Sequence, residues 1–461
     1  MKMAQNRVDS NIVGIALTRW VIFYHAFLVG LEYSCIYVSL LYYLQELHVY
    51  NAAMYFCVLM SCTSTGSLFM STLTKQFGKL TSNIKWFLVV LALISFVGNL
   101  LYTSHSSVWF LVVGRLLCGF VDSSTDVIQG TFGKLYANEQ SRLMDFASKY
   151  ELFYTCGFLT GPLFVASLWK YKTHLGNWSI DRYNGVAFIM AWFFLLDALL
   201  MMCCGQNLNN LVVEQEEDNK VDQAFEEDNK ELTQKTNLER YLRLKKGSTE
   251  NLMKNDDVIT DRQPHWLILL IFAHSLLINF ICNTSEMLVV ILSVQRIKLP
   301  PINFYFLVVS CLFIFMFGVT KVWRKFFNDV TKRVAPMLLC VAISILSNVL
   351  LIVISSTTFG GYHFKTFCMF LVILLNSLTA FTISPATQNL IAVLFHNDQQ
   401  RFEQDVKRWL MIYRVFGICG LVLAGFIVHH LWVIYVCFIG IQILFSMTIL
   451  LNKSQLSSES N

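Results

Sequence analysis

The sequence predicts an all-α membrane protein with twelve transmembrane helices arranged as two six-helix bundles. Of its 461 residues, 55% are hydrophobic and only 14% are charged, whereas charged residues make up about a quarter of an ordinary soluble domain. Twelve apolar runs are long enough to cross a bilayer as helices, for which about eighteen residues suffice. The runs fall into two sets of six, separated by one long polar stretch.

The order of these runs defines the predicted domains. The first set is expected at 20–44, 52–74, 86–103, 108–133, 146–169 and 183–205, and the second at 265–292, 302–323, 335–358, 364–393, 409–429 and 432–451. The chain is therefore divided into an N-terminal segment (1–19), a first bundle (20–205), a linker (206–263), a second bundle (264–451) and a tail (452–461).

The linker is rich in Glu, Asp, Asn and Lys, and its segment Glu216–Lys220 is repeated as Glu226–Lys230. So little apolar content cannot offset the entropy cost of ordering, so we expect this linker to be mostly disordered. Within it, Tyr241–Leu244 has the Y-x-x-Φ form that sorting adaptors read. The linker is thus predicted to connect the bundles and to offer a candidate adaptor site.

Basic residues outside the runs predict the orientation in the membrane. With a cytoplasmic N-terminus, 27 Lys and Arg lie on the cytoplasmic side and 6 on the opposite side, which follows the positive-inside rule. Both termini and the linker are therefore predicted to be cytoplasmic. The tripeptide Asn177-Trp178-Ser179 lies in the loop between the fifth and sixth runs, on the opposite side, so we expect Asn177 to be glycosylated.

Ionisable side chains within the fourth run indicate a functional interior. Arg115, Gly119, Asp122, Asp126 and Gln129 fall within about 40° of one line on a helix. A charge inside a span costs a few kcal/mol unless it faces a cavity or a partner. Arginine and carboxylates together suit proton coupling or anion binding. The alternative is a fixed ion pair between helices.

Two more carboxylates lie in the first run of each half of the chain. Glu32 shares a face of the first run with His25, and Glu286 shares a face of the seventh run with Asn279 and Asn283. Their corresponding places favour a shared central cavity. The alternative is polar packing between helices.

Other polar residues in the runs are weaker candidates. Arg414 is near enough to the end of its run to extend its charge to the membrane surface. His274 is expected to be a hydrogen-bonded packing residue. Glu151 and Asp197 have less support from the pattern than Glu32 and Glu286.

The chain resembles the major facilitator superfamily in its six-plus-six pattern and in two motifs. Arg115-Leu116-Leu117-Cys118-Gly119 is similar to the R-x-x-x-G element of span four, which the family associates with proton coupling. Gly157, Gly161 and Pro162 match the span-five G-x-x-x-G-P element, described as typical of antiporters; a close helix crossing explains the same glycines. The loop Lys75–Lys79 keeps the family's Gly and Lys but lacks its Asp.

Within that superfamily, the first half is most similar to the lysosomal branch associated with ceroid lipofuscinosis. The resemblance implies a lysosomal or late endosomal membrane, with the plasma membrane as the alternative.

These observations favour a secondary active carrier, coupled to protons or ions, that moves a small solute by alternating access. Its candidate substrate-binding or coupling residues are Glu32, Arg115, Asp122, Asp126 and Glu286.

An ion channel on the same fold and a receptor or scaffold without transport are the alternatives. The expected partners are the lipid bilayer and a small solute, without nucleic acid, metal or cofactor. No nucleotide-binding glycine loop or nucleophile motif indicates an enzyme.

Overall fold

The computed structural model describes residues 2–76, 83–104, 107–136, 140–168, 170, 172–175, 178–207, 265–314, 334–356, 361–394, 399–427 and 430–451. The linker beyond Asn207, with its Tyr241–Leu244 motif, lies outside the described residues. So do Gly78 of the loop motif, Asn177 and the tail.

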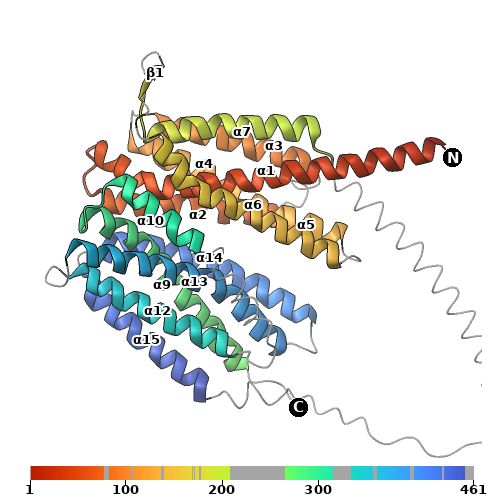
Figure 1. Ribbon diagram of the computed structural model, residues 1–461. Coiled ribbons are helices and arrows are strands. Elements are labelled where there is room, and N and C mark those ends of the chain that lie inside the picture. Colours follow the sequence, from red (N-terminus) through yellow and green to blue (C-terminus); the bar gives the residue numbers. More distant parts are fainter. Residues whose placement is uncertain are drawn as a thin grey trace, which may run out of the picture.

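Helices form at all twelve predicted positions (Figure 1). The first half contains α1 (Lys2–Glu46), α2 (Ala52–Gln76), α3 (Ile84–Thr103), α4 (Val108–Asp122), α5 (Ser124–Leu135), α6 (Gln140–Ser167) and α7 (Asn184–Cys204). The second half contains α9 (His265–Gln295), α10 (Pro301–Ile314), α12 (Val334–Ser355), α13 (Tyr362–Leu394), α14 (Gln399–Ile427) and α15 (Leu431–Leu451). Figure 1 shows the first half as a red-to-yellow bundle beside a green-to-blue second bundle.

Ten of the described helices are long and apolar enough to cross a membrane. The helices at the predicted fifth and eighth spans, α6 and α10, are not among them. The first half of α6 carries charged residues such as Arg142, Asp145 and Lys149, and α10 is described for 14 residues only. The chain is thus an all-α polytopic membrane protein, as the apolar runs predicted.

Several helices extend beyond the apolar runs that predicted them. α1 begins at Lys2 and α14 at Gln399, well before the predicted 20 and 409. A hydrophobic run ends where the hydrocarbon ends, but the helical hydrogen bonds can continue into water. The predicted fourth span also differs, because it divides into α4 and α5 at Ser123, whose N–H bonds the Phe120 carbonyl at 3.3 Å.

A short hairpin precedes α7. Strands β1 (Thr173–Leu175) and β2 (Trp178–Ile180) pair antiparallel, with His174 opposite Ser179. The hairpin projects from the opposite end of the bundles from the start of α1 (Figure 1).

Glycines allow the helices of the first bundle to cross closely. A Cβ at Gly157 on α6 would collide with the Phe27 carbonyl of α1 and would lie 2.9 Å from the Leu31 nitrogen. Gly161 packs in the same way against Ser34 and the backbone of α1. The predicted glycine motif, with Pro162 inside the helix, therefore forms the α1–α6 crossing by letting two backbones approach.

A second pair of glycines joins α2 to α4. A Cβ on Gly119 would collide with the Thr63 carbonyl, and one on Gly66 would collide with the Leu116 carbonyl. Small residues on both helices thus bring the two backbones together. This crossing determines which side chains of α2 can reach the polar face of α4.

The two bundles contact each other mainly through α2 against α14 and α6 against α10, with α1 touching α9 and α10. Gly425 of α14 lies against Met54 and Cys57 near the start of α2. Tyr42 of α1 donates a hydrogen bond of 3.1 Å to the Leu299 carbonyl just before α10. The bundles therefore share a long interface built from helices of both halves.

We predict that Gly157→Ala lowers the free energy of unfolding by about 1–3 kcal/mol, since the new methyl group meets backbone atoms that cannot move aside cheaply. Thermal unfolding of the purified protein in detergent measures the effect. Gly440→Ala in α15 is the matched control, because nothing lies within 4 Å of the added carbon. Equal stability of the two variants would show that the α1–α6 crossing tolerates separation.

Candidate functional site

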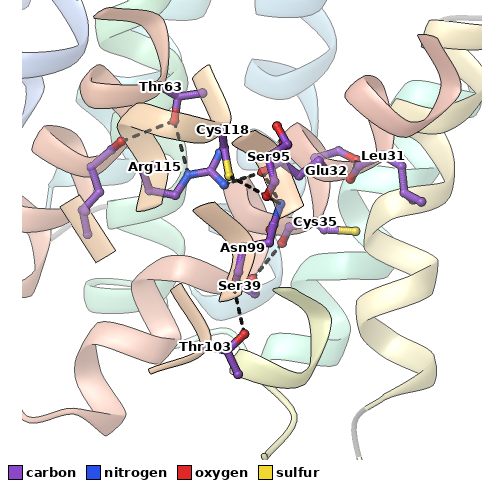
Figure 2. Close-up of polar contacts among 12 residues, drawn as sticks. Leu31, Glu32, Cys35, Ser39, Thr63, Ser95, Asn99, Thr103, Arg115 and Cys118 are labelled. Carbon is purple, nitrogen blue, oxygen red and sulfur yellow. Dashed lines mark hydrogen bonds and ion pairs between the residues drawn. The ribbon is translucent and has the colours of Figure 1, made fainter. Parts of the chain in front are cut away.

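A buried ion pair between α4 and α1 lies at the centre of the first bundle (Figure 2). The Arg115 Nη1 atom is 2.8 Å from Glu32 Oε1. The two side chains are 0% and 4% exposed. The structure thus joins two of the predicted site residues, which come from spans one and four.

Neutral groups also contact this pair. Arg115 Nε donates to Thr63 Oγ1 of α2 at 3.3 Å, and Asn99 Nδ2 of α3 donates to the same Glu32 oxygen at 3.4 Å. The Arg115 guanidinium also lies 6.0 Å from the centre of the Tyr102 ring, a distance at which a cation is attracted to the ring face. Four helices therefore converge on one arginine.

A row of hydroxyl groups on α2 faces the polar stripe of α4 and α5. Thr63, Ser67 and Ser71 recur at four-residue spacing on α2. Thr63 contacts Arg115, the Ser67 hydroxyl donates to Asp122 Oδ2 at 2.9 Å, and the Ser71 hydroxyl donates to Asp126 Oδ2 at 3.0 Å. The spacing of these hydroxyls was the signal in the sequence that could have identified the partner of the charged stripe.

The stripe reaches the second bundle at Asp126. Both Asp126 oxygens accept hydrogen bonds from Arg414 of α14, at 2.9 Å from Nη1 and 2.8 Å from Nη2. The side chains are 33% and 40% exposed. Arg414, expected to extend its charge toward the membrane surface, has its guanidinium held by a carboxylate of the other bundle in a bidentate contact.

Glu286 lies at the junction of α9 with α1 and is not joined to Glu32. Its backbone carbonyl accepts a hydrogen bond of 2.9 Å from the Tyr37 hydroxyl of α1, and Tyr33 is the side chain with the main electrostatic influence on its carboxyl group. Glu32 instead faces Arg115 inside the first bundle. The two corresponding carboxylates thus have different partners.

A second buried polar group joins α1, α5 and α7. His25 Nδ1 lies 2.6 Å from Asp197 Oδ2, and His25 Nε2 lies 2.9 Å from Ser124 Oγ. The same three residue types form hydrolase triads, but here all three are at most 1% exposed, so a substrate carbonyl cannot approach the serine. The arrangement connects helices where the fourth span divides. No spacing in the sequence connects positions so far apart.

The remaining predicted residues lie outside these clusters. Gln129 donates a long hydrogen bond of 3.5 Å to Glu151, and both are exposed. Asn279 donates to the Tyr413 carbonyl at 2.7 Å. The expectation of a hydrogen-bonded His274 is wrong for the described residues, among which neither ring nitrogen has a partner; the ring stacks on Phe445 instead.

Comparisons with known proteins agree with this architecture. The model of the Major Facilitator Superfamily matches residues 22–402. The MFS-type transporter PUL3 of Kluyveromyces lactis is 23% identical over 186 residues, which are 39% of this chain and 40% of that protein. The chain thus matches about two fifths of the length of this curated relative.

Solved structures show the same fold. A POT family transporter in complex with 5-aminolevulinic acid superposes with a TM-score of 0.66 at 10% identity, covering 95% of this chain and 96% of that one. The nucleoside transporter NupG gives a TM-score of 0.63 at 11% identity, with 94% and 98% covered.

The apolar helices and their two-bundle fold define the class as a multi-pass membrane protein. The chain belongs to the major facilitator superfamily, as its motifs indicated.

We predict that Glu32→Gln and Arg115→Gln each lower the free energy of unfolding by about 3–5 kcal/mol, since each leaves an uncompensated buried charge. The double variant should be less destabilised than either single one. Chemical or thermal unfolding in detergent measures all three. A double variant at least as unstable as the sum of the single variants would show that the two charges do not act as a pair.

Proposed function

We propose that this protein is a secondary active carrier that moves a small solute by alternating access, with coupling to protons or another ion. The observation that carries the proposal is the Asp126–Arg414 ion pair, which connects the two bundles at one end of their interface. Alternating access requires such contacts to form and break while each bundle stays intact.

The two ion pairs differ in exposure, and this difference supports one pair that stays closed and one that opens. The Arg115–Glu32 pair is almost fully buried within one bundle, where losing one partner costs several kcal/mol. The Asp126–Arg414 pair is more than a third exposed on its Arg414 side, and such pairs contribute only about 0–1 kcal/mol. The first pair therefore stabilises a rigid body, and the second can open within a transport cycle.

The orientation belongs to the same proposal. The distribution of basic residues supports a cytoplasmic position for both termini and the linker, so the Asp126–Arg414 pair would close the cytoplasmic end. It would thereby supply the charge contact that the loop Lys75–Lys79 lacks. The similarity of the first half to the ceroid-lipofuscinosis-associated branch supports a late endosomal or lysosomal membrane, and Tyr241–Leu244 is the proposed adaptor signal.

Asp122 is the proposed coupling residue. Its carboxylate receives a hydrogen bond from Ser67, and it lies within electrostatic reach of Asp126, Arg414 and Glu32. It is thus placed between the rigid pair and the pair that opens. A carboxylate whose charged neighbours change during the cycle can bind a proton in one state and release it in the other.

Opening of the cytoplasmic end can be tested by first neutralising each charge of the pair and then exchanging the two charges. We predict that Asp126→Asn or Arg414→Gln increases hydrogen–deuterium exchange in the second half of α2 and the first half of α14, because the bundles separate more often. The double reversal Asp126→Arg with Arg414→Asp should restore protection.

The matched control is Lys149→Gln, which removes an exposed ion pair of 2.7 Å with Asp145 inside a single helix. Protection that is unchanged in both single variants, or lost equally in the control, would contradict a role for Asp126 and Arg414 in closure.

We predict that Asp122→Asn abolishes proton-linked flux while leaving a folded protein, since the amide cannot carry the proton. Proteoliposomes with an internal pH dye, exposed to a small-molecule cell extract, report the flux as a pH change. Asp145→Asn, at an exposed position of α6, serves as the control. A normal pH signal from Asp122→Asn would remove this residue from the coupling mechanism.

A further inference from the structure

The buried group of His25, Asp197 and Ser124 contains two titratable side chains that the proposed mechanism does not use. His25 Nδ1 lies 2.6 Å from Asp197 Oδ2, and His25 Nε2 lies 2.9 Å from Ser124 Oγ. The imidazole and the carboxylate are 0% and 1% exposed. Three helices, α1, α7 and α5, thus meet at one imidazole ring that has no exposed surface.

His25 is the only hydrogen-bond partner of the Asp197 side chain among the described residues. The second carboxylate oxygen, Oδ1, is buried and has no partner among them. Arg19, the nearest basic residue before His25 in α1, is paired instead with Asp145 of α6 at 3.6 Å. An ionised carboxylate that is buried without a counter-charge is strongly unfavourable. A proton held by the His25–Asp197 pair therefore supplies the positive charge that this site requires.

The helices packed against this pair bring few other titratable groups to it. Tyr24 of α1 is within electrostatic reach of Asp197, and the Tyr150 hydroxyl of α6 is hydrogen-bonded to Thr125 of α5 at 2.9 Å. Tyrosine hydroxyls are neutral near physiological pH. Asp197 is the only charged residue of α7, and helix α3, which packs against α7 and α5, has its only charged residue, Lys85, in the first turn. The buried pair is therefore the place at which a proton can be exchanged here.

Uptake of a proton reverses one hydrogen bond of this group. In neutral His25 with its Nδ1–H directed to Asp197, the Nε2 atom accepts a hydrogen bond from the Ser124 hydroxyl. A proton taken from water forms an N–H bond at Nε2, and this N–H then donates to the Ser124 oxygen. Hydrogen bonds from a charged donor are roughly twice as strong as neutral ones. The proton therefore determines how firmly α1 holds Ser124.

Ser124 is the first residue of α5, directly after the point at which the fourth span divides. Asp122 ends α4 and contacts Ser67 of α2, and Asp126 lies in the first turn of α5 and contacts Ser71. Two residues along a helix rotate the side-chain direction by about 200°, so Ser124 lies on the opposite side from both aspartates. A contact that holds Ser124 thus also holds the turn that carries Asp126.

We propose that His25 and Asp197 form a proton-binding site that controls the start of α5. With the proton bound, the imidazolium holds Asp197 and Ser124 through charged hydrogen bonds, and α5 is fixed against α1 and α7. Without it, the buried carboxylate is uncompensated and the start of α5 is released. The link to transport rests on the proposed function, because it requires that Asp126 closes one end of the interface. The proton site itself does not depend on that role.

Hydrogen–deuterium exchange of the full-length purified protein in detergent tests the proposal. Exchange is compared at about pH 5 and about pH 8, because histidine takes up and loses its proton between these values. Labelling times are scaled for the intrinsic pH dependence of amide exchange. We expect the amides of Ser124–Leu135 in α5 to exchange about tenfold more slowly at the lower pH, the difference expected between a charged and a neutral hydrogen bond.

Variants assign the response to the pair. His25→Gln keeps an amide that can bond both neighbours but cannot take up a proton, so α5 should exchange at the same scaled rate at both pH values. The double variant His25→Gln with Asp197→Asn also removes the buried carboxylate and should give the same result, which keeps the test valid if the single variant does not fold. His48→Gln, at an exposed position just after α1, is the matched control and should respond to pH as the wild type does.

Equal scaled exchange of α5 at both pH values in the wild type would overturn the inference, and so would a pH response that persists in both variants. In either case alternating access stands if α2 and α14 still respond to Asp126→Asn and Arg414→Gln. A pH response of α5 that depends on His25, together with unchanged protection of α2 and α14 in those two variants, would instead contradict the carrier mechanism and leave the proton site in place.

Discussion

The Arg115–Glu32 ion pair is the interaction on which the arrangement of the first bundle depends. A guanidinium with no exposed surface must find its partners inside the protein, since the hydrocarbon around the bundle provides none. Its partners come from α1, α2 and α3, which have to approach α4 closely. The glycines at 66 and 119 make the α2–α4 approach possible, so small residues and the buried charge are two parts of one constraint.

The hydroxyl row of α2 extends this constraint along the membrane. Because Thr63, Ser67 and Ser71 follow one face at the spacing of a helical turn, each charge on the facing helices meets one hydroxyl. Exposure increases along this row, from the buried Arg115 to the partly exposed Asp126. The charges along this row are therefore buried at one end and partly exposed at the other.

The sequence predicted the helices well because hydrophobic runs indicate which segments of the chain contact the hydrocarbon. It did not predict where α1 and α14 begin, since helices continue into water without any apolar signal. The polar face of the fourth span was visible from periodicity alone. Its partners were not, because Arg414 lies 288 residues from Asp126 and the His25–Asp197 contact joins residues 172 apart. The superfamily was recognisable from local motifs, which depend on short spacings.

Helices α2 and α14 contact each other near both of their ends along one flank of the interface between the bundles. Gly425 meets Met54 and Cys57 near one end of the two helices, and Arg414 meets Ser71 near the other. These contacts hold the two helices together at both ends of that flank. A lipid molecule could pass between α2 and α14 only if they separated.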